Sequence, residues 1–200
     1  MKIILASQNK GKIKEFKEIL KIQVFAYTNF IPSFFIEENG NSFKQNAFIK
    51  LRAVERALKN ADCFEDDMLI LADDSGVSIK DLANEPNIYS ARYAGINASD
   101  KQNNEKVIKK LKEKKIKSSK AFYTACLAFS YKEHEFSVHG KMHGEVCTKM
   151  QGSNGFGYDS IFVPKGFDKT LASLDENVKK KLSHRAKALK LVKILLESFE

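Results

Sequence analysis

The hydrophobic and polar positions at the start of the chain predict a strand, a turn and a helix. Lys2–Ala6 is a short run rich in β-branched residues, which predicts a buried strand, and Ser7-Gln8-Asn9 ends it. From Lys10 to Leu20 the apolar residues have helical spacing: Ile13, Phe16, Ile19 and Leu20. The chain is therefore expected to open as strand, polar turn and helix.

A second strand and a longer helix are expected next. Ile22–Tyr27 is predicted as a strand, and Thr28–Asn41, which contains two breakers (Pro32 and Gly40), as a loop. Ser42 is in a position to cap a helix that runs to about Leu58.

The middle of the chain combines a buried run with irregular sequence. Met68–Ala72 is continuously apolar and ends in Asp73-Asp74-Ser75-Gly76, after which Val77–Ile79 is expected to form a separate short strand. Residues 81–99 are predicted to be irregular, and Ser99 or Asp100 to cap the lysine-rich helix that follows.

The last part of the chain predicts paired strands and a closing helix. Phe122–Tyr131 and Glu135–Cys147 are expected to form a hairpin through Lys132-Glu133-His134, followed by a short strand at Ile161–Val163. Leu182–Leu196 is predicted as an amphipathic helix. Helices between early strands and pairing between later ones predict an α/β fold with a mixed sheet, formed by one continuous domain over residues 1–200.

Composition and cysteine usage indicate a soluble cytoplasmic protein with no membrane partner. The chain has 200 residues, 43% of them hydrophobic, and its apolar runs are far too short to span a bilayer. The N-terminal residues lack the layout of a signal peptide. The three cysteines, Cys63, Cys126 and Cys147, have no zinc-type spacing and are expected to be buried or incidental thiols.

The charge of the chain suits an anionic partner. The formal net charge is +9, residues 101–120 hold nine lysines against two glutamates, and Lys179–Lys193 has seven basic residues and no acid. Either a small polyphosphate or a nucleic acid would match this balance. A solvated lysine face on a helix is the simpler interpretation of residues 101–120, and no RNA-binding or zinc-finger signature supports the nucleic-acid alternative.

The polar turn Ser7, Gln8, Asn9, Lys10, Gly11 and Lys12 is a candidate phosphate site. A turn between a strand and a helix directs backbone N–H groups at an anion, and Lys12 can add its charge. The segment is not a Walker A loop, and a solvated turn would explain it equally well.

Acidic pairs supply candidate metal ligands. Asp73 and Asp74 follow an apolar strand, and neighbours on an extended chain point to opposite sides, so one can face a ligand while the other braces the structure. Magnesium prefers such oxygen ligands. The alternatives are an ordinary turn for Asp73-Asp74, a solvated loop for Glu37-Glu38, and a surface lysine for Lys50.

Two further segments carry groups that could hold a nucleoside. Gly152–Asp159 sets Phe156, Tyr158 and Asp159 among glycines, where an aromatic ring can stack on a base and a carboxylate can pair with its edge. A turn with core aromatics is the alternative. Lys179, His184 and Arg185 form a donor-rich group at the start of the last helix, expected to bind carbonyl or phosphate oxygens.

Taken in order, these segments resemble the inosine triphosphate pyrophosphatase family, also called Ham1-like. The matching segments are Ala6–Lys12, Ser42–Ala47 with Lys50, Ala72–Gly76, Tyr89–Gly95, Gly155–Asp159, and Ser183–Arg185 with Ala188-Leu189. Each is weakly specific, but the ordered set covers nearly the whole chain. The resemblance implies an elongated mixed sheet with flanking helices, two lobes around a central cleft, and a homodimer that hydrolyses inosine, deoxyinosine and xanthosine triphosphates to the monophosphate.

The resemblance also implies roles for individual residues. Asp74 would be the general base and a Mg²⁺ ligand, with Glu38 as the other ligand and Glu37 as the alternative to it. The triphosphate would be held by residues from Ser7 to Lys12, by Lys50 and by Ser75. The nucleoside would be held by Phe156, Gly157, Tyr158, Asp159, Lys179, His184 and Arg185.

Several positions depart from the family pattern, and one enzyme class competes with it. Asn87 stands where glycine is frequent, Ser160 replaces a common proline, Ser173 replaces a frequent acid, and Lys44-Gln45 stands where a glutamate is frequent. None of these removes a group with an implied role. A Maf-like nucleotide pyrophosphatase, acting on pyrimidine or modified nucleotides, shares the strand–turn–helix opening and is the nearest alternative.

Overall fold

The computed structural model describes residues 2–20, 23–132 and 134–198, and it divides into two compact units. The first unit contains Met1–Asp74, Ala125–Gly140 and Arg185–Glu200. The second contains Ser75–Thr124 and Lys141–His184. Each unit has its own hydrophobic core.

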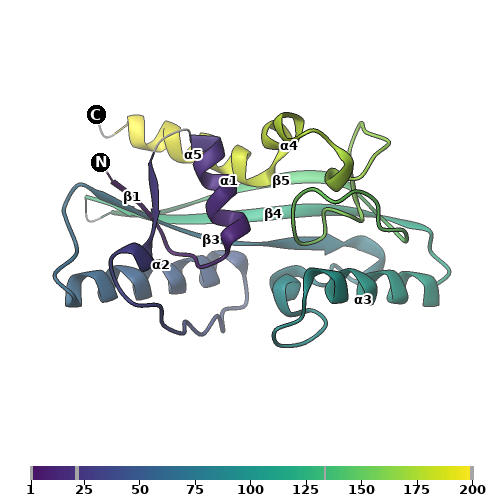
Figure 1. Cartoon of the computed structure of the whole chain (residues 1–200), viewed down its shortest axis with the longest axis horizontal. Helices are drawn as coiled ribbons and strands as arrows, with labels where there is room; N and C mark the ends of the chain where they lie inside the picture. Colours follow the sequence, from purple (N-terminus) through teal and green to yellow (C-terminus); the bar gives the residue numbers. More distant parts are fainter. Residues whose placement is uncertain (1, 21–22, 133, 199–200) are drawn as a thin grey trace. The chain divides into compact units, whose positions relative to one another are not determined.

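Among the described residues, the strands form one mixed sheet in the order β2-β1-β3-β4-β5-β6 (Figure 1). Their bounds are β1 Lys2–Leu5, β2 Val24–Ala26, β3 Met68–Ile79, β4 Ser118–Tyr131, β5 His134–Cys147 and β6 Phe162–Pro164. β1 is parallel to both β2 and β3, with Ile3 opposite Val24 and Leu69, whereas β5 and β6 are antiparallel. The predicted α/β fold with a mixed sheet is confirmed.

Helices precede and follow these strands. Their bounds are α1 Lys10–Leu20, α2 Phe43–Asn60, α3 Asp100–Glu113, α4 Glu176–Leu182 and α5 His184–Glu197. Short 3-10 helices lie at Tyr27–Asn29, Lys80–Leu82, Asn87–Arg92 and Leu171–Ser173. The predicted caps are confirmed: Ser42 accepts from Gln45 N at the start of α2, and Ser99 forms a capping box with Gln102 at the start of α3.

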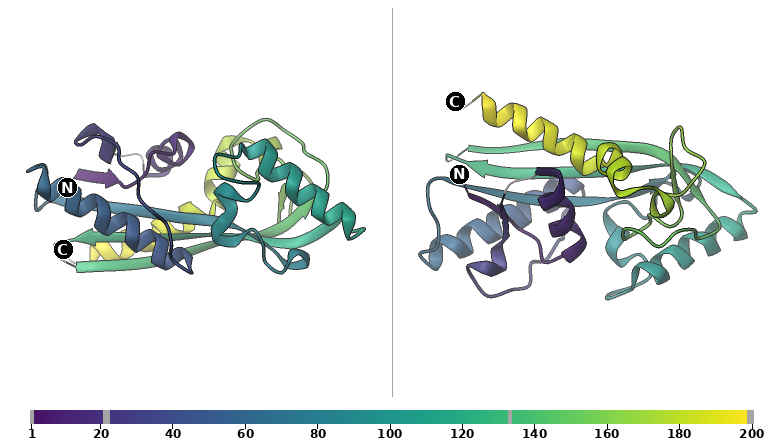
Figure 2. Two further views of the ribbon diagram at one scale, coloured as in Figure 1. Left: turned by 90° about the horizontal axis from the view of Figure 1, so that it is seen from below. Right: turned by 45° about the horizontal axis from the view of Figure 1, so that its top comes forward.

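In the first unit the sheet is buried on both faces, because successive residues of β1 point to opposite sides. Ile3 and Leu5 pack in a core with α1 and α5, whereas Ile4 packs in a second core with α2. Figures 1 and 2 show α1 and α5 on one face of this part of the sheet and α2 on the other.

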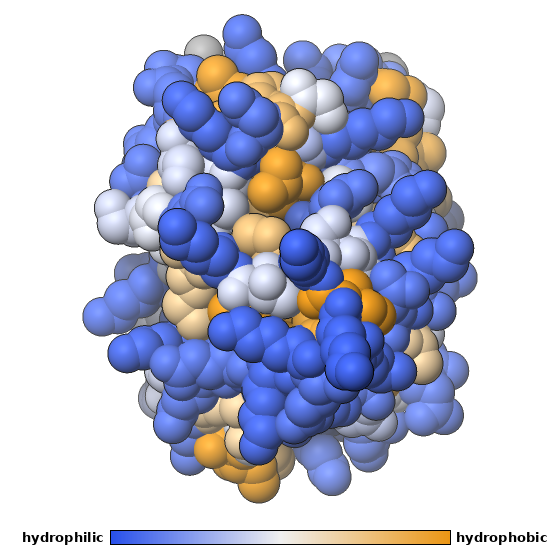
Figure 3. Space-filling view, turned by 90° about the vertical axis from the view of Figure 1, so that its right-hand side faces the viewer, coloured by the Kyte–Doolittle hydropathy of each residue, from blue (hydrophilic) through white to orange (hydrophobic). Residues whose placement is uncertain are grey.

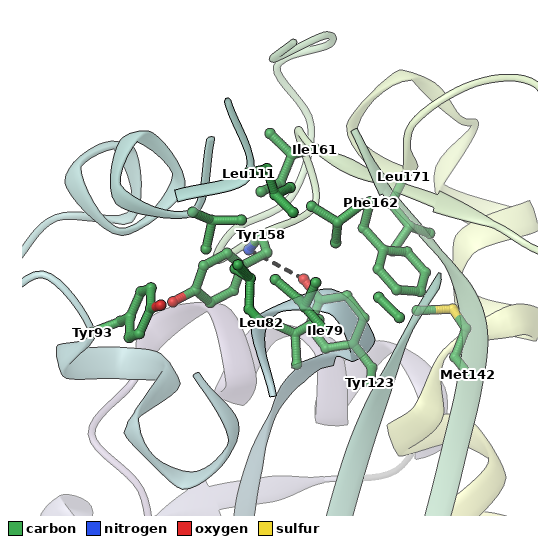
Figure 4. Packing of buried hydrophobic residues seen from close by; sticks show 14 residues of the cluster. Ile79, Leu82, Tyr93, Leu111, Tyr123, Met142, Tyr158, Ile161, Phe162 and Leu171 are labelled. Carbon is green, nitrogen blue, oxygen red and sulfur yellow. Dashed lines mark hydrogen bonds between the residues drawn. The ribbon is translucent and has the colours of Figure 1, made fainter. Parts of the chain in front are cut away.

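The core of the second unit packs aromatic side chains between the sheet and α3. Tyr123, Tyr158 and Phe162 lie together with Ile79 and Leu111 (Figure 4). This unit therefore holds the nucleoside-segment residue Tyr158 in its hydrophobic core.

Four predicted elements differ from the structure. Met68–Ala72 and Val77–Ile79 are parts of one strand, β3, because Asp73 and Asp74 have buried cationic partners that let them stay extended inside a sheet. The predicted helix Leu182–Leu196 is two helices, α4 and α5, since the backbone at Ser183 is extended (φ −51°, ψ 136°).

The predicted strand Ile22–Tyr27 is shorter, because Tyr27 begins a 3-10 helix, and Ile22 lies outside the described residues. Glu133 of the predicted hairpin turn also lies outside them, but both flanking strands are confirmed. The last short strand is shifted by one residue to Phe162–Pro164.

The lysine-rich helix α3 has the contacts of a solvated helix face. Lys101 and Lys109 approach glutamates one turn on, at 3.9 Å and 4.0 Å, and Lys106 and Lys110 lie over the ring of Tyr93. Hydrophilic side chains cover most of the face drawn in Figure 3, with hydrophobic ones in small separate groups. In the part of the chain that is described, no helix is long and apolar enough to cross a membrane.

Candidate active site

The polar turn between β1 and α1 is ordered by its own side chains. Asn9 Oδ1 accepts from Lys12 N at 3.0 Å, and Asn9 N donates to Ser7 Oγ at 3.2 Å. Gln8 is exposed and donates to Tyr27 Oη, and Lys10 is exposed as the first residue of α1. The turn thus places the first N–H groups of α1 at the carboxyl end of β1, as the sequence predicts for a phosphate site.

Asp73 is the centre of a buried ionic network. It is 1% exposed, and its Oδ2 lies 2.6 Å from Lys12 Nζ and 3.3 Å from Arg185 Nε. Arg185 Nη1 also pairs with Glu15 Oε2 at 2.7 Å. Lys12 and Glu15 are three residues apart, so α1 supplies both from one face.

The charges in this network decide the ionisation of Asp73. Burial opposes its charged form, but Lys12, Arg185 and Lys50 outweigh burial and keep the pKa of Asp73 below its ordinary value. Burial lowers the pKa of Lys12 in spite of Asp73, and the nearby charges of Lys50 and Arg185 lower it further. An anion placed beside Lys12 would therefore favour its charged form.

Asp74 points to the other side of β3 and joins a second network. Lys50 Nζ lies 2.6 Å from Glu38 Oε2 and 3.2 Å from Asp74 Oδ1, and Lys50 is only 8% exposed. Burial, opposed by Lys50 and Lys12, raises the pKa of Asp74. The structure thus brings together Lys50, Glu38 and Asp74, the group that the family resemblance implies, and separates Asp73 from them by strand alternation.

The loop that carries Glu38 is fastened to the start of α2. Gly40 N donates to Asn46 Oδ1 at 2.8 Å, and Asn41 N donates to Gln45 Oε1 at 2.6 Å. Gln45, which departs from the family pattern, therefore supports this loop. Glu37 is exposed while Glu38 is half-buried against Lys50, which favours Glu38 over Glu37 as a ligand.

Ser75 and Gly76 follow Asp74 at the start of the second unit. Ser75 is half-buried, and Gly76 meets the turn at Asn87–Ser90 so closely that a Cβ would collide with Ser90 Oγ and the Asn87 carbonyl. Asn87 has a positive φ of 52°, a conformation that favours glycine. The asparagine that stands here in place of the family's frequent glycine therefore adopts a backbone conformation that glycine would also adopt.

The segment Gly152–Asp159 is braced from within the second unit. Both oxygens of Asp159 accept hydrogen bonds: Oδ1 from Tyr123 Oη at 3.2 Å, and Oδ2 from Phe156 N at 3.2 Å and from Lys179 Nζ. At Gly155 (φ 89°) a Cβ would collide with both Lys179 Nζ and Asp159 Oδ2. Phe156 is half-buried, and Lys179 Nζ lies over its ring at 5.9 Å from the centroid.

Helix α3 fixes the backbone of Gly157. Gly157 N donates to Asp100 Oδ2 at 2.7 Å, and Asn104 Nδ2 donates to Gly157 O at 2.8 Å. Tyr158 Oη donates to Ser90 O at 2.7 Å. These bonds hold the two residues that follow Phe156.

Arg185 has different neighbours from those expected. Lys179 and His184 contact residues of the second unit, whereas the Arg185 guanidinium pairs with Asp73 and Glu15 in the first. The sequence does not reveal that Arg185 pairs with Glu15 and Asp73, or that Tyr123 contacts the site. One signal was present: Glu15 lies three residues after Lys12, which places both on the same face of a helix.

The fold and these segments define a known protein class. The sequence matches the Ham1 family over residues 3–194, so the chain belongs to this family. Among solved structures, the Staphylococcus aureus Ham1 protein is similar with a TM-score of 0.83 and 37% identity, covering 100% of both chains.

Individual relatives carry more specific names. A dITP/XTP pyrophosphatase of Nautilia profundicola is 51% identical over 99% of this chain and 98% of its own. One of Campylobacter jejuni is 50% identical over 98% of both chains. A solved nucleoside-triphosphatase / dITP/XTP pyrophosphatase from Mycobacterium abscessus has a TM-score of 0.70 and 31% identity, covering 96% of this chain and 97% of its own.

The Asp73 network leads to a prediction about stability. Asp73→Asn leaves Lys12 and Arg185 buried with less compensating charge, so the free energy of unfolding in urea should fall by about 3 kcal/mol. The folded pKa of Asp73 is depressed, so this contribution is complete above its ordinary value of 3.8 and is lost as pH falls below that value.

An exposed ion pair supplies the control for this measurement. Glu65→Gln breaks the surface pair with Lys2 and should leave the free energy of unfolding nearly unchanged, because both side chains are exposed. Equal losses for the two variants, or a loss for Asp73→Asn that grows towards acidic pH, would contradict the role given to Asp73.

Proposed function

We propose that this chain hydrolyses non-standard purine nucleoside triphosphates, namely the deoxyinosine, inosine and xanthosine triphosphates, to the monophosphate and diphosphate. The observation that carries the proposal is the pair of networks on β3, in which adjacent carboxylates pair with the half-buried Lys12 of α1 and the buried Lys50 of α2. Membership of the Ham1 family and the names of close relatives support it.

The lysines of the two networks and the turn after β1 are suited to hold the triphosphate. Lys12 and Lys50 supply positive charge, and the residues from Ser7 to Gly11 supply backbone and side-chain donors. Ser75, which follows Asp74 in β3, would take part in the same role. These groups would orient the α-phosphorus for attack by water.

Glu38 and Asp74 fit a Mg²⁺ ion. Asp74 Oδ2 is buried and has no hydrogen-bond partner among the described residues, although a buried carboxylate oxygen normally has one. No group of three His, Cys, Asp or Glu side chains forms a complete metal site in the described part of the chain, but Mg²⁺ needs only one or two carboxylates when phosphate oxygens complete its shell. Bound there, the ion would neutralise phosphate charge and acidify water.

Asp74 would act as the general base. Its carboxylate accepts a proton from the attacking water as the water oxygen bonds to the α-phosphorus. The bond from that phosphorus to the bridging oxygen breaks, and diphosphate leaves. Lys50, held beside Asp74, stabilises the charge that develops on the phosphate oxygens.

The nucleoside would be held by the second unit. The ring of the half-buried Phe156 would stack on the base, and Gly157, Tyr158, Asp159 and Lys179 fix the segment around it. His184 is suited to donate to the 6-oxygen of hypoxanthine or xanthine, where adenine presents an amino group. The proposed contact of Arg185 with the base is less well supported, since its guanidinium is engaged by two carboxylates.

We infer a cytoplasmic homodimer in which residues 1–200 make one pyrophosphatase domain, acting on the nucleotide pool and on no nucleic acid. The family resemblance supports the dimer.

A substrate panel tests the function. With Mg²⁺, diphosphate release should be strong from inosine, deoxyinosine and xanthosine triphosphates and about 10²-fold or more weaker from adenosine triphosphate, because the 6-amino group faces a donor. Release from thymidine triphosphate alone would indicate the Maf-like class. Salt-dependent oligonucleotide binding without hydrolysis would indicate a nucleic-acid module.

A matched pair of variants tests the metal ligand. Glu38→Gln should raise the Mg²⁺ concentration for half-maximal activity by about tenfold or more, since loss of even a supporting group commonly weakens metal binding by 10–100-fold. Glu37→Gln, at the exposed neighbouring position, should leave it unchanged. The opposite result would assign the metal to Glu37.

The general base is tested by turnover. Asp74→Asn should lower kcat by about 10²-fold or more while the inosine triphosphate still binds, because the variant keeps the shape but cannot accept the proton. Asp66→Asn removes an exposed carboxylate of the same unit and should have normal turnover. Near-normal kcat for Asp74→Asn would remove Asp74 from this role.

A further inference from the structure

Tyr123 contacts two separate segments that the proposed function assigns to the nucleoside. Its hydroxyl donates to Asp159 Oδ1 at 3.2 Å and accepts from Tyr158 N at 3.1 Å, the bond drawn in Figure 4. Its ring is stacked on the imidazole of His184, with 4.7 Å between centroids and 12° between planes. One side chain thus joins the segment around Phe156 to the start of α5.

The surroundings of Tyr123 allow little movement. It lies in the middle of β4, is 6% exposed, and packs against the ring of Phe162 at 4.8 Å. Burial raises the pKa of Tyr123 well above its ordinary value, and the Asp159 charge adds to this, so the hydroxyl keeps its proton and donates. Stacked aromatic rings favour a fixed mutual orientation.

The two contacts have different consequences for a bound base. The hydroxyl holds Asp159, and Asp159 accepts from Phe156 N and from Lys179. The hydroxyl therefore acts on the position of Phe156, the proposed stacking residue. The ring sets the plane of His184, which acts on the direction of any hydrogen bond from that imidazole. Directional donors discriminate between bases only when their direction is fixed.

We propose that Tyr123 is a positioning residue for purine selection, which orients His184 through ring stacking and the Phe156 segment through Asp159 towards a 6-oxopurine nucleoside. This inference rests on the proposed function.

The test compares two buried phenols of the same core. Tyr123→Phe keeps the ring and removes the hydroxyl. Tyr93→Phe is the matched control: Tyr93 is 8% exposed, belongs to the same cluster, and donates to a carboxylate, Glu85 Oε2, at 2.6 Å. Tyr93 has no role in the proposed site.

Binding and selectivity are the decisive measurements. Tyr123→Phe should raise KM for inosine triphosphate and Kd for inosine monophosphate by about tenfold, as expected for loss of a hydrogen bond to a charged group. It should also reduce the preference over adenosine triphosphate and leave inhibition by diphosphate unchanged. Tyr93→Phe should change neither the KM nor the preference.

Each alternative result has a clear meaning. If both variants lower Tm equally and keep the wild-type preference, Tyr123 is only structural and the inference is wrong. If the wild-type enzyme shows no preference for inosine triphosphate, the proposed function fails and this inference fails with it.

A measurement on the unmodified chain remains decisive even when Tyr123→Phe does not fold. With ¹³C-labelled tyrosine, inosine monophosphate should shift the Tyr123 ring signals and diphosphate should not. Unshifted Tyr123 signals at saturating inosine monophosphate would overturn the proposal.

Discussion

Two adjacent carboxylates on β3 determine how the first unit can hold buried charge. Because side chains alternate along a strand, Asp73 and Asp74 face different partners. Asp73 compensates Lys12 and Arg185, and Asp74 shares Lys50 with Glu38. A buried cation without a carboxylate partner would be strongly destabilising, so the two acids of β3, together with Glu38, allow Lys12 and Lys50 to lie inside the first unit.

The charge balance of these networks bears on the need for a metal. Three buried or half-buried cations face four carboxylates: Lys12, Lys50 and Arg185 against Glu15, Glu38, Asp73 and Asp74. The lysines are therefore already compensated before any phosphate binds. A triphosphate adds several negative charges, and a divalent cation at Glu38 and Asp74 would supply the positive charge that the protein lacks.

The sequence predicts local features well and long-range partners poorly. The caps at Ser42 and Ser99 follow from nearby residues, and they are confirmed. The prediction that the strand ends at Asp73-Asp74 is wrong. Acids and glycine are rare in strands and favour turns, but here lysines from distant segments compensate the two acids inside the sheet. The candidate residues in the site came mainly from the resemblance, whereas the partners Glu15 and Tyr123 depend on contacts between segments far apart in sequence.

Base selection places a different demand on the second unit. Hypoxanthine and adenine have nearly the same shape, so a pocket distinguishes them by the direction of hydrogen bonds rather than by size. An imidazole that could rotate would present a donor nitrogen to hypoxanthine and an acceptor nitrogen to adenine, and would therefore bind both bases. In this chain His184 is stacked on a tyrosine held at its hydroxyl by Asp159 and Tyr158 N, and Asp159 is itself tied to Lys179. Selectivity would then depend on a continuous set of packed and hydrogen-bonded groups, of which His184 would be the member that donates to the 6-oxygen of the base.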